Sequence, residues 1–99
     1  MTVLNIDLFL SEVLGEDAAK VYNTQTVLNR SYESDYIAAY AYGNENEPLK
    51  VHNRVAAIGA KELGLDLDEY LRVWDEAIEA INSFWETPEE FRDTRYREE

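Results

Sequence analysis

The feature that most constrains this fold is a long, regular apolar pattern between residues 67 and 85. Six apolar side chains recur there in alternating steps of three and four residues, the spacing that keeps them on one side of an α-helix. We call this set the heptad seam: Leu67, Leu71, Trp74, Ile78, Ile81 and Trp85. A second flank widens the apolar arc: Tyr70, Val73, Ala77, Ala80 and Phe84. So wide an arc predicts the central helix of an all-α bundle, in contact with two neighbours.

Three further segments have a clear helical pattern. Residues 5–14 place apolar side chains at helical spacing, with Asn5 as a cap and Gly15 as a stop. Residues 31–42 and 48–63 are also predicted helices, each followed by a glycine.

Two stretches are less regular. Residues 16–30 favour a helix, although the polar and β-branched run at 23–27 leaves a short extended segment open. Thr87 and Pro88 have the pattern of a helix start, so a short last helix is predicted around Phe91. The charged end at 92–99 is expected to be frayed.

Together these patterns predict a compact bundle of four or five helices in a single acidic domain spanning residues 1–99. The chain is 45% hydrophobic and 12% aromatic, enough for one modest core. There is no cysteine, which excludes disulfides and thiolate metal sites. We find no signal peptide and no apolar run of transmembrane length, so a cytoplasmic protein without a membrane partner is expected.

The charge is large and uneven. Aspartate and glutamate number 21 against 9 lysines and arginines, a net charge of −12. Residues 65–91 hold nine acidic residues and one basic residue, Arg72, whereas residues 49–64 hold three basic residues and one acidic residue. A strong negative field repels nucleic acid and anionic membranes and attracts basic partners.

On the predicted helix at 67–85 the acids form a line. We call it the acidic row: Asp68, Asp75, Glu79 and Glu86, with Glu69 and Glu76 beside it. Carboxylates on adjacent turns lie roughly 5–6 Å apart, close to the phosphate spacing of a DNA strand, on the order of 6–7 Å. The row is therefore an ordinary solvated face, a rigid imitation of a phosphate backbone, or an interface for a basic partner that involves no such imitation.

Tyrosines give a second interaction signal. Tyr32, Tyr36 and Tyr40 share one helical stripe beside acidic residues, a surface that can meet arginine through salt bridges and cation–π contacts. The alternative is a tyrosine-lined core, with Tyr36 or Tyr40 pointing inward and Tyr32 and Tyr42 pointing outward.

Catalytic and metal motifs are missing from the sequence. His52 is the only histidine and has no acid–nucleophile constellation or second ligand at metal-binding spacing. A helix-turn-helix is disfavoured because its recognition helix would begin at Asp66-Leu67-Asp68-Glu69 and press carboxylates against phosphates. We therefore expect no enzyme, no cofactor, no metal site and no direct nucleic-acid binding.

Two functional hypotheses remain. The first is a non-enzymatic protein that docks on a basic, nucleic-acid-binding surface of a larger protein, such as a phage or mobile-element inhibitor of a host defence protein. Its predicted contact residues are Asp68, Asp75, Glu76, Glu79, Glu86, Tyr32 and Tyr36. The second is a structural or assembly module, for instance a virion component, a subunit adaptor or a homodimer, that uses the Trp74 and Trp85 side of the heptad seam.

Overall fold

Five α-helices account for most of the chain, which this computed structural model describes over residues 3–98. The helices pack together as the all-α bundle that the sequence predicts. In chain order the elements are β1 (Val3–Leu4), α1 (Ile6–Val13), α2 (Glu16–Ser31), α3 (Glu33–Tyr42), α4 (Glu47–Leu63), α5 (Leu67–Glu86), the 3-10 turns η1 (Glu89–Phe91) and η2 (Thr94–Tyr96), and β2 (Arg97–Glu98).

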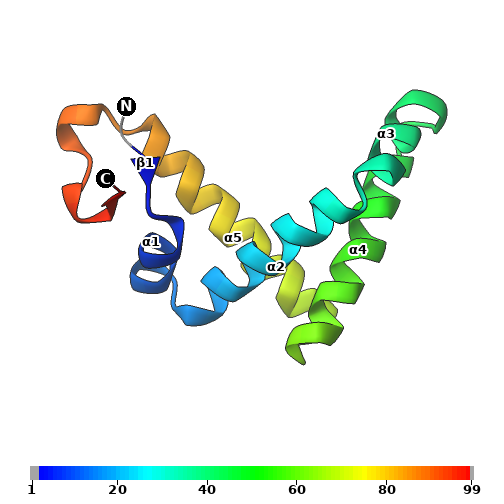
Figure 1. The fold of residues 1–99 in the computed structure, drawn as a ribbon, viewed down its shortest axis with the longest axis horizontal. Helices are drawn as coiled ribbons and strands as arrows, with labels where there is room; N and C mark the ends of the chain where they lie inside the picture. The colour runs from blue at the N-terminus through cyan, green and yellow to red at the C-terminus, as the bar shows by residue number, and fades with distance from the viewer. Residues whose placement is uncertain (1–2, 99) are drawn as a thin grey trace.

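The bundle is elongated and has the shape of an open V. Figure 1 shows α2 and α5 crossing near their middles, with α1 at one side and the α3–α4 hairpin at the other. The principal extents are 43 × 31 × 20 Å, and the radius of gyration is 15.0 Å. A compact domain of 100 residues has a radius of gyration of about 13 Å. The elongation leaves long helix faces without a neighbour.

Helix boundaries fall close to those predicted. The Asn5 side chain accepts a hydrogen bond from the Leu8 amide at 3.2 Å, and Asp66 accepts one from the Asp68 amide at 3.2 Å. Gly64 ends α4 in the left-handed conformation, with φ of 69°, where a glycine is favoured because a side chain would strain the backbone. The local sequence therefore sets where these helices begin and end.

The segment at 16–30 is helical throughout, as favoured, and the extended alternative is wrong. Polar side chains are accommodated because their hydroxyls bond to the turn before them: Thr26 Oγ1 donates to the Tyr22 carbonyl at 2.9 Å, and Ser31 Oγ to the Val27 carbonyl at 3.1 Å. Helix α2 packs against α1, α4 and α5, so it is as central as α5.

Helix α5 has the predicted bounds, but its burial differs from the sequence pattern. Its fully packed residues are Tyr70, Val73 and Ala77, which belong to the second flank. The heptad seam is only half-buried, and Trp85 is 42% exposed. The reason lies in the tertiary packing. Helices α2 and α4 lie over the second flank, so the heptad seam is at the edge of the interface that α5 forms with them.

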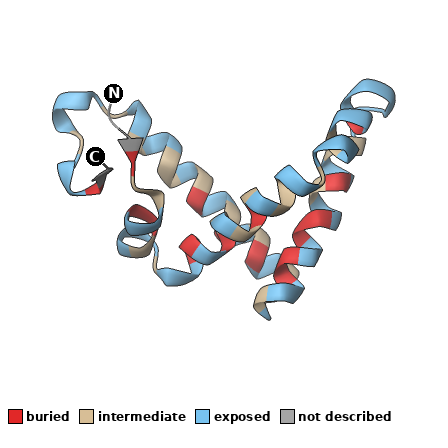
Figure 2. Cartoon of the chain, viewed as in Figure 1, coloured by how far each residue is buried: buried red, intermediate tan, exposed pale blue. Residues whose placement is uncertain are grey.

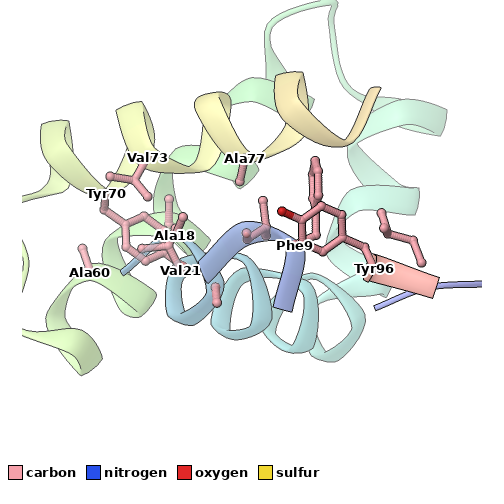
Figure 3. Close-up of a cluster of buried hydrophobic side chains, with 12 residues drawn as sticks. Phe9, Ala18, Val21, Ala60, Tyr70, Val73, Ala77 and Tyr96 are labelled. Atoms are coloured by element: carbon pink, nitrogen blue, oxygen red, sulfur yellow. The ribbon is translucent and has the colours of Figure 1, made fainter. Parts of the chain in front are cut away.

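The main core fills the space between α1, α2, α5 and the second half of α4. Figure 2 shows the buried positions lining the inner sides of these helices, and Figure 3 shows the cluster in detail. Phe9 meets the rings of Phe84 and Tyr96 edge to face, at 5.4 and 5.2 Å between centroids. The buried members are Leu4, Phe9, Leu10, Ala18, Ala19, Val21, Ala56, Ala60, Tyr70, Val73, Ala77 and Tyr96.

A smaller arm core lies at the far end of the V. Its buried residues are Ala39, Val51 and Val55, with Leu28, Tyr32 and Tyr36 packed against them. We call residues 33–55, which comprise α3 and the first half of α4, the arm. Helix α4 joins the two regions because its first half lies in the arm core and its second half in the main core.

A chain of hydrogen bonds, one buried and two partly buried, also links the two cores. The Tyr70 hydroxyl donates to Gln25 Oε1 at 2.8 Å, and Gln25 Nε2 donates to Asn29 Oδ1 at 2.8 Å. The Tyr36 hydroxyl donates to the same Asn29 oxygen at 2.9 Å. Gln25 is fully buried, so these bonds satisfy both ends of an amide that would otherwise be costly to bury.

The frayed end predicted for 92–99 makes defined contacts over residues 92–98, and Glu99 lies outside the described residues. Arg97–Glu98 pairs antiparallel with Val3–Leu4, and Tyr96 is buried against Phe9. The Arg92 guanidinium donates to the carbonyls of Phe84, Trp85 and Thr87 at 3.2, 2.7 and 2.8 Å, which satisfies free acceptors at the end of α5. These contacts join the segment after α5 to the main core. The predicted last helix is the short 3-10 turn η1.

Candidate functional site

The acidic row lies on the side of α5 opposite the main core. Asp68, Asp75, Glu79 and Glu86 are all exposed, while Tyr70, Val73 and Ala77 on the other side are buried. Steps of seven and four residues return to almost the same side of a helix, so the row is nearly straight. Glu76 is also exposed, beside it. The five predicted acids are therefore accessible along a single helix.

Little of this charge is neutralised within the chain. Arg72 pairs with Glu76 at 2.9 Å and with Glu69 at 3.7 Å, and all three side chains are largely exposed. Such solvated pairs contribute roughly 0–1 kcal/mol each. Among the side chains that the structure describes, no lysine or arginine forms an ion pair with any member of the acidic row. Toward the described basic side chains, the row thus presents four carboxylates without an ion pair.

Three of the row's carboxylates share a shallow groove with a tryptophan. The groove has a volume of about 530 Å³ and is lined by Trp74, Asp75, Ile78, Glu79, Asn82, Ser83 and Glu86. The indole is held in place from two sides: Tyr22 of α2 stacks on it at 5.6 Å, and the His52 ring of α4 lies 6.2 Å away. The groove thus combines a fixed aromatic wall with free negative charge.

The predicted tyrosines lie elsewhere. Tyr32 and Tyr36 are half-buried against the arm core and do not line the groove of α5. Burial raises the pKa of Tyr36; nearby Tyr40 raises it further, and Arg54 opposes the shift. Tyr36 points inward, as the alternative of a tyrosine-lined core allowed, whereas the outward position that this alternative gave Tyr32 is wrong. The freely exposed tyrosines are Tyr40, at 76%, and Tyr42, at 91%.

His52 is part of the packing around Trp74. Burial lowers the pKa of its imidazole, an effect that nearby Asp75 opposes. Within residues 3–98 no group of three His, Cys, Asp or Glu side chains is arranged to hold a metal ion. Over the same residues, none of the helices combines the length and apolarity that a membrane crossing demands.

Two structurally important residues escape sequence reasoning. Gln25 follows Val21 by four residues, which places it on the buried face of α2, but a lone polar residue in an irregular stretch gives no hint of its partner. Gly59 lies where Tyr70 crosses α4: an added Cβ would lie 2.7 Å from the Tyr70 Cζ atom. Only the pairing of α4 with α5 shows why a glycine stands inside this helix.

Comparisons with protein-family models, with curated proteins and with solved structures find no match to this chain. The candidate site therefore rests on its own geometry: a straight, uncompensated acidic row beside a fixed indole.

Proposed function

We propose that this chain is a non-enzymatic binding protein that docks the acidic face of α5 on a basic surface of a larger protein. The single observation that supports this most is the acidic row, which is exposed, held on one rigid helix and free of ion pairs with the described basic side chains. Carboxylates on a rigid helix need little rearrangement when they bind arginine or lysine side chains. Their negative field also raises the rate at which the protein associates with a positively charged surface.

The spacing of the row supports a nucleic-acid-binding surface as the partner. Asp75 and Glu79 are one turn apart, about 6 Å along the helix axis, and Asp68 and Glu86 extend the line by about 10 Å on either side. Phosphates along a DNA strand recur on the order of every 6–7 Å. The step of about 6 Å at the centre of the row matches this repeat, whereas the outer steps of about 10 Å are longer. A channel that binds phosphates can therefore accept Asp75 and Glu79 in place of two neighbouring phosphates.

In its most specific form, the proposal is an inhibitor encoded by a phage or mobile element that occupies such a channel in a host defence protein. Small size and a charge of −12 support this form. A competitor of this kind acts by occupancy and needs neither a cofactor nor a catalytic group.

The test is capture of the partner with matched charge variants. Asp75→Lys/Glu79→Lys reverses the centre of the row, and Glu89→Lys/Glu90→Lys makes the same net-charge change at exposed positions outside α5. Each protein is immobilised and exposed to lysate from the source organism or its host. The bound fraction is washed at low and high salt and identified by mass spectrometry, and circular dichroism checks helicity.

We expect a nucleic-acid-binding protein to be retained by wild type and by Glu89→Lys/Glu90→Lys at low salt. High salt should release it because ion screening weakens charge-led contacts. The Asp75→Lys/Glu79→Lys variant should lose it while remaining helical. Equal capture by all three proteins would sink the proposal.

A second candidate function is an assembly module. The half-exposed indole of Trp85 at the end of the heptad seam favours it. Trp74 is less available because Tyr22 stacks on its ring. In this case Trp85→Ala should release the partner, and the complex should persist at high salt.

A further inference from the structure

Helix α3 is attached to the rest of the bundle by little apolar contact. Of its ten residues only Ala39 is buried. Over residues 3–98 each of the other helices packs against two or more helices, whereas the packing of α3 is almost confined to α4. Figure 1 shows α3 at the tip of one limb of the V, beside the first half of α4 and far from α1. Hydrophobic burial therefore contributes less to holding α3 than to holding any other helix.

Three contacts hold α3 against its neighbours. Ala39 packs in the arm core, the Tyr36 hydroxyl donates to Asn29 Oδ1 at 2.9 Å, and Asp35 lies 3.4 Å from Arg54. The Asp35–Arg54 pair is exposed, so solvent screens it. The attachment of α3 thus depends mainly on one small buried side chain and one partly buried hydrogen bond.

The packing of α3 on α4 is also incomplete. A hollow of about 550 Å³ lies where the two helices meet the loop between them, and its wall includes Ala38, Ala39 and Tyr42 of α3 and Val51 of α4. Side chains that line an open hollow keep part of their surface in contact with water, so they contribute less free energy of burial than a filled core does.

The ends of α3 add little to its stability. Tyr32, at its N-cap position, makes no capping hydrogen bond through its side chain, and Gly43 at the other end has no side chain to offer. A helix of ten residues is marginal in water by itself, even when it is built from good helix formers. Once detached from α4, α3 would therefore lose its helical structure.

We propose that α3 is a lid on the first half of α4, and that it opens as one cooperative unit by unfolding between Glu33 and Asn46. Helix α4 stays folded in the open state because Ala56 and Ala60 lie in the main core and both α2 and α5 pack against it. Segments with few buried apolar contacts open in this way, at a free energy below that of global unfolding.

Opening of the lid changes the surface that the arm presents to solvent. It uncovers Val51, which is buried in the closed state, and it releases Arg54 from Asp35. Residues 49–64 hold three basic residues and one acidic residue, so the uncovered face lies in a stretch of net positive charge. The lid therefore controls access to a surface opposite in sign to the acidic row of α5.

The experiment is native-state hydrogen exchange of the full chain, followed amide by amide by NMR. Two matched variants each truncate one buried valine: Val51→Ala in the arm core and Val73→Ala in the main core. Val51 shares the arm core with Ala39 of α3 and loses that contact on opening, whereas Val73 stays packed when the lid is open. Circular dichroism confirms that both variants are folded.

We expect the hydrogen-bonded amides of α3 in wild type to exchange at one common rate, about a hundredfold faster than the slowest amides of α2 and α5. Val51→Ala should speed exchange in α3 by about tenfold, because the closed state loses packing that the open state lacks. Val73→Ala should leave exchange in α3 unchanged and should speed exchange of the slowest amides by about tenfold, since only global unfolding exposes Val73.

Protection of α3 equal to that of α5 in wild type overturns the proposal. So does equal acceleration of α3 by the two variants, which would mean that α3 opens only when the whole chain unfolds. A steady gradient of rates from the ends of α3 towards its middle also overturns it, because the helix would then fray residue by residue. None of these outcomes depends on the acidic row, so the lid and the proposed binding function are tested separately.

Discussion

The main core and the arm core are stabilised in different ways. The main core buries twelve side chains from α1, α2, α4, α5 and both ends of the chain, and three aromatic rings meet edge to face within it. The arm core buries only three, from α3 and α4. Apolar burial therefore accounts for the main core, whereas the arm depends far more on how it is joined to the rest of the molecule.

The junction between the two regions is partly polar. Gln25 sits at its centre and binds Tyr70 of the main core on one side and Asn29, with Tyr36, on the other. A satisfied polar chain adds little net stability but fixes one arrangement, because any other leaves a buried amide unpaired. The difference between the cores thus teaches that the orientation of the arm is set by directional bonds as well as by contact area.

The largest expected effect comes from Gly59→Ala, at the point where the two regions meet. Alanine is the better helix former by about 1 kcal/mol, so helix propensity alone predicts a more stable protein. The new Cβ would, however, crowd the Tyr70 ring, whose Cζ atom lies 2.7 Å away, and disturb the bond to Gln25. We expect the free energy of unfolding in urea to fall by about 3 kcal/mol.

The control for this change is Asn53→Ala, which adds an alanine at an exposed position of the same helix. It should alter stability by no more than about 0.5 kcal/mol. If Gly59→Ala is as stable as wild type, then α4 and α5 do not approach as closely as described, and the junction between the regions is looser.

A smaller effect is expected from Gln25→Leu, which removes the centre of the junction and keeps a similar volume. The buried Tyr70 hydroxyl then lacks its acceptor, and Asn29 loses a donor. Leaving such groups unpaired lowers the free energy of unfolding by about 2 kcal/mol. Urea unfolding followed by circular dichroism measures it.

Tyr36→Phe sharpens the comparison because it removes only the bond on the arm side. Tyr36 is half-buried, so loss of its hydrogen bond to Asn29 should lower the free energy of unfolding by roughly 0.5–1 kcal/mol. Equal costs for Gln25→Leu and Tyr36→Phe would contradict the central position of Gln25 in the junction.

An effect close in size to that of Tyr36→Phe is expected on the pH dependence of stability. Burial, together with Glu62 and Tyr36, raises the pKa of Tyr70 to about 12, against 10.0 for a free tyrosine. Because the folded state holds this proton more tightly, its stability contribution is complete below pH 10.0 and is lost as pH rises towards 12. Between pH 10 and 11 the loss is about 1 kcal/mol.

Urea unfolding at several alkaline pH values checks this expectation, and Tyr70→Phe is the control. The variant lacks the titrating group and should show a shallower decline over the same range. If the free energy of unfolding of Tyr70→Phe declined with pH as steeply as that of wild type, the effect would come from titrating groups other than Tyr70.

Much of the molecule followed from the sequence alone. The all-α fold, the extent of α5, the capping role of Asn5 and the end of α4 before Gly64 were all readable from local spacing. The acidic row was readable too, because side chains seven and four residues apart on a helix must share a side. These features depend on residues within a few turns of each other, so no knowledge of the neighbours was needed.

Only the tertiary structure decided which faces are covered. It buried the second flank of α5 in place of the heptad seam and turned Tyr32 inward. It also joined Gln25 to Tyr70, which lies 45 residues away in the chain, and tied the two ends together as β1 and β2. Periodicity shows that a helix has an apolar side, but the free energy of burial depends on which helix lies against that side, and that choice is made between segments distant in sequence.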